Sequence, residues 1–109
     1  MVYELRIYHM NPGKLPSMKS RFEDPELELF AKHGIHVCDM WEDHSGAEII
    51  YYMCAFEDIE HREAAWKSFG DDPEWQKCAE ETEKDGKLVD KVESYFLERV
   101  PFIKPDWPG

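Results

Sequence analysis

Hydrophobic and polar residues alternate at the start of the chain, from Tyr3 to Tyr8. A period of two predicts a β-strand whose two faces differ. One face is apolar, and the other combines two opposite charges with an aromatic hydroxyl: Tyr3, Leu5 and Ile7 against Glu4, Arg6 and Tyr8. Because charges that leave water need partners, we expect this strand to pair its polar face with other charged or polar side chains.

A helical period replaces the alternation after a predicted turn at residues 11–13. Within residues 15–33, apolar side chains recur at spacings of three and four, and Gly34 is well placed to end the helix. Pro25 interrupts this pattern, because a proline ring clashes with the preceding turn of a helix. We therefore expect a kink or a break at residues 23–25.

Two strands form a predicted hairpin in the middle of the chain. Residues 35–42 alternate, and residues 48–56 are rich in Ile and Tyr. Ser45 and Gly46 lie between the two segments and favour a turn. Neighbouring strands joined by a short turn pair antiparallel.

Two further helical segments and a last strand follow the hairpin. Asp58 is expected to cap a helix that ends at Gly70, and a second helix is expected over residues 72–85, beginning with Asp-Pro. Proline is tolerated at the first helical position because the amide of that position has no helical partner. Residues 88–99 predict the final strand.

The predicted order of elements is βαββαβ, which suits an α+β, ferredoxin-like architecture. We expect a four-stranded antiparallel sheet, with the first and third strands in the centre and the helices on one face. The other face would be bare and partly apolar, and monomers rarely expose such a surface. A homodimer that packs sheet against sheet with two-fold symmetry is therefore expected.

The length of 109 residues fits one domain, which we place at residues 1–100. Residues 101–109 are expected to form a proline-rich tail in an extended conformation. The tail carries three large apolar side chains, which favour packing on the partner subunit: Phe102, Ile103 and Trp107.

The net charge of −11 repels nucleic acid and anionic membranes, so neither is an expected partner. Three cysteines without CxxC spacing, together with the absence of a signal peptide or an apolar span, indicate a cytoplasmic protein. The chain has no Gly-rich phosphate loop and no spacing typical of zinc or iron ligands. We expect no metal and no cofactor.

One set of motifs occurs in a fixed order over about residues 2–102: Tyr3–Arg6 with Pro12–Lys14, His33–Ile35, Trp41, Arg62–Trp66, Phe69, Asp72–Trp75 and Glu93–Ser94. With these motifs in this order, the chain resembles the NIPSNAP family. The resemblance implies a ferredoxin-like fold and a dimeric α+β barrel. The superfamily to which this family is similar includes cofactor-free monooxygenases, isomerases, cyclases and haem enzymes, so the resemblance implies no single reaction.

Arg6 and Glu93 are the first candidates for chemistry, because the first and last strands are expected to be neighbours. Each is expected to place a charge on the face that a dimer would bury. One interpretation is an ion pair that fixes sheet register and dimer geometry. The other is an arginine that anchors an anionic or carbonyl substrate, with Glu4 or Glu93 as base.

Aromatic side chains are dense for so short a chain, and they predict either core packing or a pocket for a planar or hydrophobic molecule. His36 either faces the partner sheet or acts as a proton shuttle in such a pocket. The pocket interpretation assigns ligand binding to Arg6, Tyr8, His36, Trp41, Tyr51, Trp66 and Glu93.

Three functions remain open from the sequence. The first is a dimer that binds a small hydrophobic or aromatic molecule. The second is a cofactor-free enzyme of the monooxygenase, isomerase or cyclase type. The third is a structural interaction module without a ligand. An open cavity with convergent polar groups would favour the enzyme, and a fully packed interior would favour the interaction module.

Overall fold

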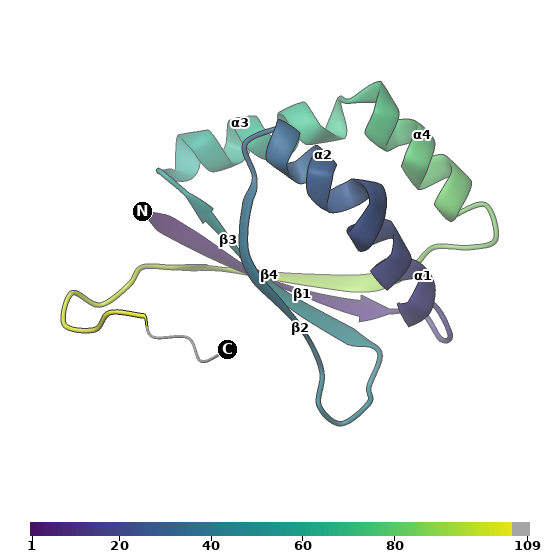
Figure 1. The fold of residues 1–109 in the computed structure, drawn as a ribbon, viewed down its shortest axis with the longest axis horizontal. Helices are drawn as coiled ribbons and strands as arrows, with labels where there is room; N and C mark the ends of the chain where they lie inside the picture. Colours follow the sequence, from purple (N-terminus) through teal and green to yellow (C-terminus); the bar gives the residue numbers. More distant parts are fainter. Residues whose placement is uncertain (106–109) are drawn as a thin grey trace.

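A computed structural model describes residues 1–105 of the chain, with four strands on one side and the helical segments on the other (Figure 1). The elements agree in order with the βαββαβ prediction, and most bounds differ by only one to three residues. They are β1 (Val2–Met10), α1 (Leu15–Arg21), η1 (Phe22–Glu26), α2 (Leu27–Lys32), β2 (His36–Glu42), β3 (Ile49–Phe56), α3 (Ile59–Gly70), α4 (Pro73–Thr82) and β4 (Val89–Leu97).

The strands form one antiparallel sheet in the order β2-β3-β1-β4. This order confirms the prediction that the first and third strands lie in the centre. All helices cover the same face of the sheet (Figure 1). The expected ferredoxin-like α+β fold is therefore confirmed.

The first helical region is broken where Pro25 predicts a break. Asp24 has the extended angles φ −158° and ψ 117°, and the segment around it, η1, joins α1 to α2. Asp58 caps α3 by accepting a hydrogen bond of 2.7 Å from the amide of His61. Helix α4 starts after Asp72 as expected but ends at Thr82, three residues before the predicted end.

The core lies between the helices and the sheet. Tyr52 of β3 is completely buried and packs edge-on against Tyr8 of β1, with 5.2 Å between ring centroids. Phe22 and Phe30, from the two halves of the broken helix, pack on Tyr52 from above. Aromatic rings thus fill the space between the layers, as the packing interpretation of the aromatic set predicts.

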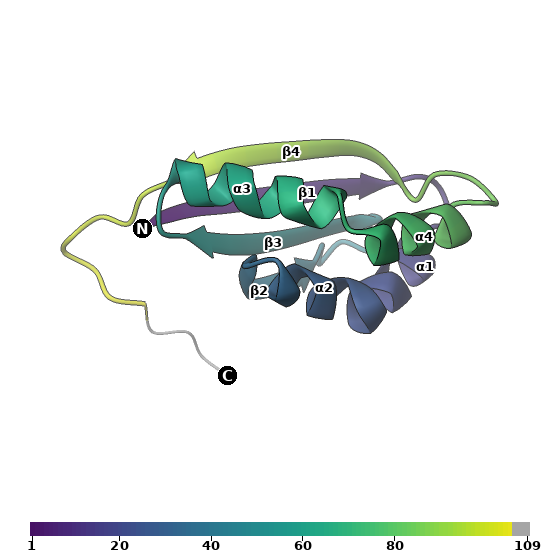
Figure 2. The same ribbon diagram turned by 90° about the horizontal axis from the view of Figure 1, so that it is seen from above.

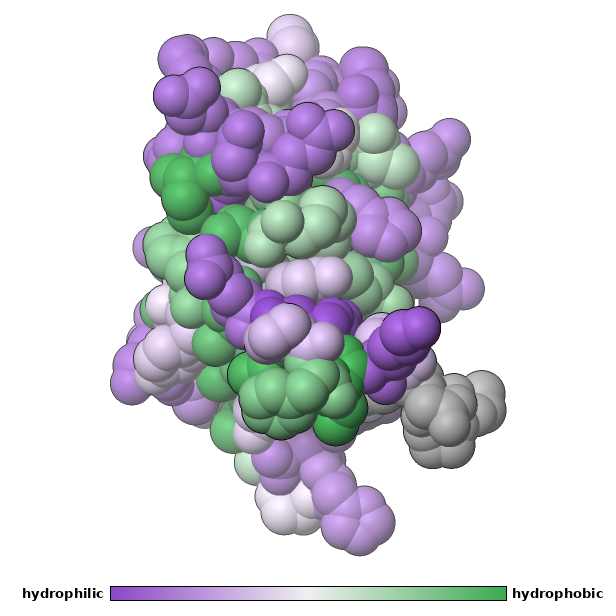
Figure 3. Space-filling model, turned by 90° about the vertical axis from the view of Figure 1, so that its left-hand side faces the viewer, coloured by the Kyte–Doolittle hydropathy of each residue, from purple (hydrophilic) through white to green (hydrophobic). Residues whose placement is uncertain are grey.

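In the part of the chain that the structure describes, no helix lies over the other face of the sheet. Side chains of β1 that alternate with buried Glu4 point to this side, and so do those that pair with them on β3 and β4. Figure 3 shows hydrophobic residues gathered below the mostly hydrophilic helices. The apolar side chains of this open face include Leu5, Ile7, Met53, Tyr95 and Leu97, with Tyr95 49% and Leu97 41% exposed.

The expected homodimer and the docking of the tail on a partner stay predictions, because the structure holds one chain. Phe102 and Ile103 are 85% and 58% exposed. Trp107 lies outside the described residues. Within residues 1–105, none of the helices has the length and apolar composition needed to cross a bilayer.

Candidate functional site

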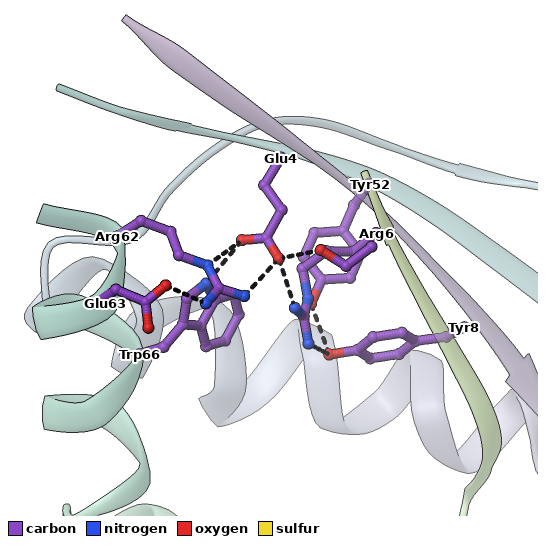
Figure 4. Close-up of polar contacts among 8 residues, drawn as sticks. Glu4, Arg6, Tyr8, Tyr52, Arg62, Glu63 and Trp66 are labelled. Carbon is purple, nitrogen blue, oxygen red and sulfur yellow. Dashed lines mark hydrogen bonds and ion pairs between the residues drawn. The ribbon is translucent and has the colours of Figure 1, made fainter. Parts of the chain in front are cut away.

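Glu4 is the centre of a polar network on the helix-covered face. Its side chain comes from the first half of β1 and is completely buried. One carboxylate oxygen accepts from Arg62 Nε at 3.0 Å and Trp66 Nε1 at 2.9 Å. The other accepts from Arg62 Nη2 at 2.8 Å, Arg6 Nη1 at 2.8 Å and Ser94 Oγ at 2.6 Å (Figure 4). Strands β1 and β4 and helix α3 thus meet at one carboxylate.

These partners keep Glu4 ionised. Burial by itself raises the pKa of a carboxyl group, but the hydrogen bonds from Arg62, Ser94 and Arg6 outweigh burial and lower the pKa of Glu4 to about 2. The residue is therefore a fixed negative charge at neutral pH, which makes it unsuited to take up a proton as a general base.

Arg6 lies on the same face, between the carboxylate and the aromatic core. Its guanidinium stacks on the ring of Trp66 at 4.3 Å and donates from Nε to Tyr52 Oη at 2.9 Å. Its Nη2 makes a longer contact of 3.4 Å to Tyr8 Oη. The side chain is 14% exposed, so the guanidinium reaches the edge of the core.

We expected Arg6 and Glu93 to lie together on the face of the sheet that a dimer would bury, and this expectation is wrong. In the β1–β4 register Arg6 pairs with Ser94, whereas Glu93 pairs with Ile7. Because side chains alternate along a strand, Arg6 points to the helices and Glu93 to the open face. Arg6 pairs instead with Glu4, to which its Nη1 donates at 2.8 Å.

Two tyrosine hydroxyls lie beside Arg6. Tyr52 Oη donates to Tyr8 Oη at 2.6 Å. Burial raises the pKa of both groups, and Arg6 lowers it by less, so both hydroxyls keep their protons at neutral pH. The pair therefore offers hydrogen-bond donors, not phenolate nucleophiles.

Glu26, the last residue of η1, is a second buried carboxyl group. It is 2% exposed and accepts from Arg21 Nε at 3.2 Å. Burial raises its pKa to about 7, because the attraction of Arg21 offsets the loss of water only in part and Glu83 adds a repulsion. Glu26 is thus a carboxyl group that titrates near neutral pH.

Strand β4 leaves part of the helix-covered side open. Figure 2 shows that it runs along the edge of the sheet, beyond the cover of the helices. Its residues on that side are Val92, Ser94 and Phe96, which we call the β4 shelf. Val92 is 47% and Phe96 is 50% exposed, and the Arg62 guanidinium lies 5.2 Å from the Phe96 ring centroid.

The structure brings together only three of the seven expected ligand-binding residues: Arg6, Tyr8 and Trp66. His36 lines a hollow of about 560 Å³ at the β2 edge, away from this network. Trp41 and Tyr51 lie on the open face, where Tyr51 Oη donates to Asp43 at 2.7 Å. Glu93 is on the open face too, bonded to His9 at 2.6 Å.

Sequence reasoning did not assign Tyr52, Arg62 and Ser94 to a site. One signal for Arg62 was available, because Arg62 and Trp66 are four residues apart and share a face of α3. A cation and an indole N–H on one helix face indicate a buried acceptor opposite them. The strand pattern predicts polar partners for the face that carries Glu4, but it does not identify Arg62 and Trp66 as those partners.

Another cluster resembles a serine–histidine–aspartate arrangement. His33 Nδ1 is 2.6 Å from Ser68 Oγ, and His33 Nε2 is 2.6 Å from Asp72 Oδ2, which Lys32 also contacts. Ser68 lies inside helix α3, where the backbone amides are occupied by helical hydrogen bonds and form no oxyanion hole. The cluster therefore ties the end of α2 to α3 and to the start of α4.

Within residues 1–105, no three His, Cys, Asp or Glu side chains are grouped closely enough to hold a metal ion. The cysteines of this part are free thiols, and burial raises the pKa of Cys54 to about 12. A thiol with so high a pKa is a poor nucleophile at neutral pH.

Comparison with known proteins identifies the fold and the family. The family profile described as NIPSNAP matches residues 3–104. A solved structure of an uncharacterised NIPSNAP domain protein from Burkholderia xenovorans is 26% identical and has a TM-score of 0.81, with 97% of this chain and 100% of that chain covered. No protein in the curated collection matches.

Two more distant structures share the fold. A mutant of MhuD with two manganese protoporphyrin IX molecules bound per active site has a TM-score of 0.66 at 13% identity, covering 96% of this chain and 100% of that one. An antibiotic biosynthesis monooxygenase has a TM-score of 0.60 at 11% identity, covering 93% and 100%. At these identities the likeness concerns the fold alone.

Proposed function

Since this chain belongs to the NIPSNAP family, we propose that it acts within that fold as a homodimer which binds a small hydrophobic or aromatic molecule on the β4 shelf. The observation that carries the proposal is the exposure of Val92 and Phe96 on the side of the sheet that is otherwise covered. Apolar side chains left uncovered beside a buried core mark a place where another apolar group packs.

The surroundings of the shelf suit recognition of a small molecule. Ser94 hydrogen-bonds to Glu4, and Arg6 and Arg62 bind the same carboxylate, so the polar groups beside the shelf are held in place by one buried residue. Polar groups that are fixed before binding lose little conformational entropy when a ligand arrives.

The open face supports the homodimer. It exposes apolar side chains from the strands, among them Leu5, Met53 and Tyr95, and burying them against a second copy removes that surface from water. The shelf lies on the opposite side of the sheet and stays accessible in such a dimer.

Isothermal titration calorimetry with an uncharged bicyclic probe, naphthalene-2-carboxamide, tests the proposal. Phe96→Ser is expected to weaken binding by about tenfold, because it removes an aromatic contact. Ile59→Ser is the matched control, since Ile59 is 43% exposed on α3 and not part of the shelf. Absence of binding to the wild type, or equal loss in both variants, would refute the shelf as a site and favour an interaction module.

Glu26 favours a second candidate, a cofactor-free enzyme. Its carboxyl group titrates near neutral pH, as a general acid or base requires, and its charge acts on Tyr8. In that case Glu26→Gln abolishes turnover of a bound substrate without weakening binding. Equal turnover by the variant and the wild type would remove this candidate.

A further inference from the structure

We propose that the molecule bound on the β4 shelf is an organic carboxylate, whose oxygens accept hydrogen bonds from the Tyr8 hydroxyl and the Arg6 guanidinium. This inference rests on the proposed function and adds the chemical class of the ligand. It follows from the hydrogen-bond inventory of the network, its charge and its apolar border.

One of the two hydroxyl protons of the tyrosine pair has no acceptor within the pair. Tyr8 and Tyr52 carry two hydroxyl protons, and one of these makes the 2.6 Å bond between them. Arg6 only donates to the pair, at 2.9 Å to Tyr52 and 3.4 Å to Tyr8. With Tyr52 donating, the Tyr8 proton has no acceptor within residues 1–105. A hydroxyl that is more than nine-tenths buried, with an unused proton, favours an incoming acceptor.

Arg6 also has donor capacity left. A guanidinium has five N–H groups, and Arg6 directs one nitrogen to each of Tyr52, Glu4 and Tyr8. The contact from Nη2 to Tyr8 is long, and the side chain is 14% exposed. Nη2 and the Tyr8 hydroxyl are therefore adjacent donors, which suits the oxygens of one planar carboxylate.

The local charge favours an anion. Glu4 contributes one negative charge and Arg6 and Arg62 one positive charge each, which leaves one net positive charge around the buried carboxylate. Glu63 also binds Arg62, but it is 62% exposed and solvent screens its charge. The chain as a whole carries −11, yet charges farther away than about 8 Å are largely screened at physiological salt.

The border of the site distinguishes an organic acid from an inorganic anion. Val92 and Phe96 offer exposed apolar surface next to Arg62, whose guanidinium lies 5.2 Å from the Phe96 ring. A molecule with an apolar body covers this surface while its carboxylate reaches the donors. Phosphate or sulfate gains nothing from the shelf, because neither has an apolar body.

Calorimetry with 2-naphthoate and naphthalene-2-carboxamide, which share a ring system and differ in charge, tests the inference. We expect the wild type to bind the carboxylate at least about tenfold more tightly, and higher salt to weaken only the carboxylate. Tyr8→Phe is expected to reduce the preference to below about threefold with amide binding unchanged. Tyr51→Phe, the same change on the open face, is the control.

The outcomes separate the two proposals. Equal binding of both probes by the wild type overturns the carboxylate inference and leaves the shelf as an apolar site. Failure of both probes to bind refutes the proposed function itself. The comparison of probes in the wild type decides the inference even where Tyr8→Phe does not fold, and a thermal melt of each variant detects that case.

Discussion

Glu4 and Arg62 form a two-point contact between the central strand β1 and helix α3. Nε of Arg62 lies 3.0 Å from one carboxylate oxygen and Nη2 lies 2.8 Å from the other. Parallel hydrogen bonds between a guanidinium and a carboxylate fix both distance and orientation. The carboxylate is completely buried and the arginine is 18% exposed. The contact therefore sets how α3 lies on the sheet and holds the Arg62 guanidinium beside Phe96 of the β4 shelf.

Glu4→Gln is expected to lower the free energy of unfolding by about 3 kcal/mol, because it leaves two guanidinium groups without their shared buried anion. Chemical denaturation measures the change. Glu63→Gln is the matched control, since this residue also pairs with Arg62 but is 62% exposed, and its loss is expected below about 0.5 kcal/mol. Similar losses in both variants would show that the buried carboxylate stabilises the fold no more than the exposed one does.

The fold was predictable from the sequence because its signals are local. The break at Pro25, the cap Asp58, the helix start at Asp72 and Pro73 and the alternation in the strands each depend on neighbouring residues, and the structure has all of them. The order of the strands follows from the element order and from general rules of chain connection. These elements therefore needed no knowledge of distant contacts.

The site was predictable only in part, because it depends on register. Arg6 and Glu93 are both charged and lie on neighbouring strands, but pairing with Ser94 places Arg6 on the other face from Glu93. A shift of one residue reverses every side chain of a strand, and the sequence pattern of β4 does not fix that choice. For the same reason, the sequence did not show that Tyr51 lies on the open face and Tyr52 in the core.

The carboxyl group of Glu26 predicts an unusual dependence of stability on pH. Its pKa is about 7 in the folded protein and 4.5 ordinarily, so between these values the folded state binds more protons than the unfolded state. The free energy of unfolding therefore falls as pH rises through this window, by up to about 1.4 kcal/mol per pH unit. Denaturation of the wild type from pH 4.5 to 8 measures this slope.

Glu26→Gln is expected to remove that slope while still accepting a hydrogen bond from Arg21. Glu83→Gln is the control, because Glu83 contacts Arg21 at 3.2 Å but is 30% exposed. Parallel stability curves for the wild type and Glu26→Gln would contradict the buried, near-neutral carboxyl group. A slope lost equally in Glu83→Gln would assign it to the Arg21 cluster as a whole.

Glu4 predicts the opposite behaviour in acid. Its pKa is lowered to about 2, so its stabilising effect is complete above pH 4.5 and is lost as pH falls from 4.5 through 2. The difference in unfolding free energy between the wild type and Glu4→Gln is expected to shrink over this range. A constant difference down to pH 2 would mean that ionisation of Glu4 contributes nothing to stability.

The open face predicts that the homodimer depends on Met53. This residue pairs with Leu5 in the β1–β3 register and lies among the apolar side chains of that face, whereas Ile50 is 2% exposed in the core. Met53→Asp is expected to give monomers or aggregates, because a carboxylate buried between two sheets has no partner. Ile59→Asp, at an exposed apolar residue on α3, is expected to stay dimeric.

Sedimentation analysis at micromolar concentration measures the assembly. A wild type that sediments as a folded monomer would refute the homodimer, and a dimeric Met53→Asp variant would place the interface elsewhere.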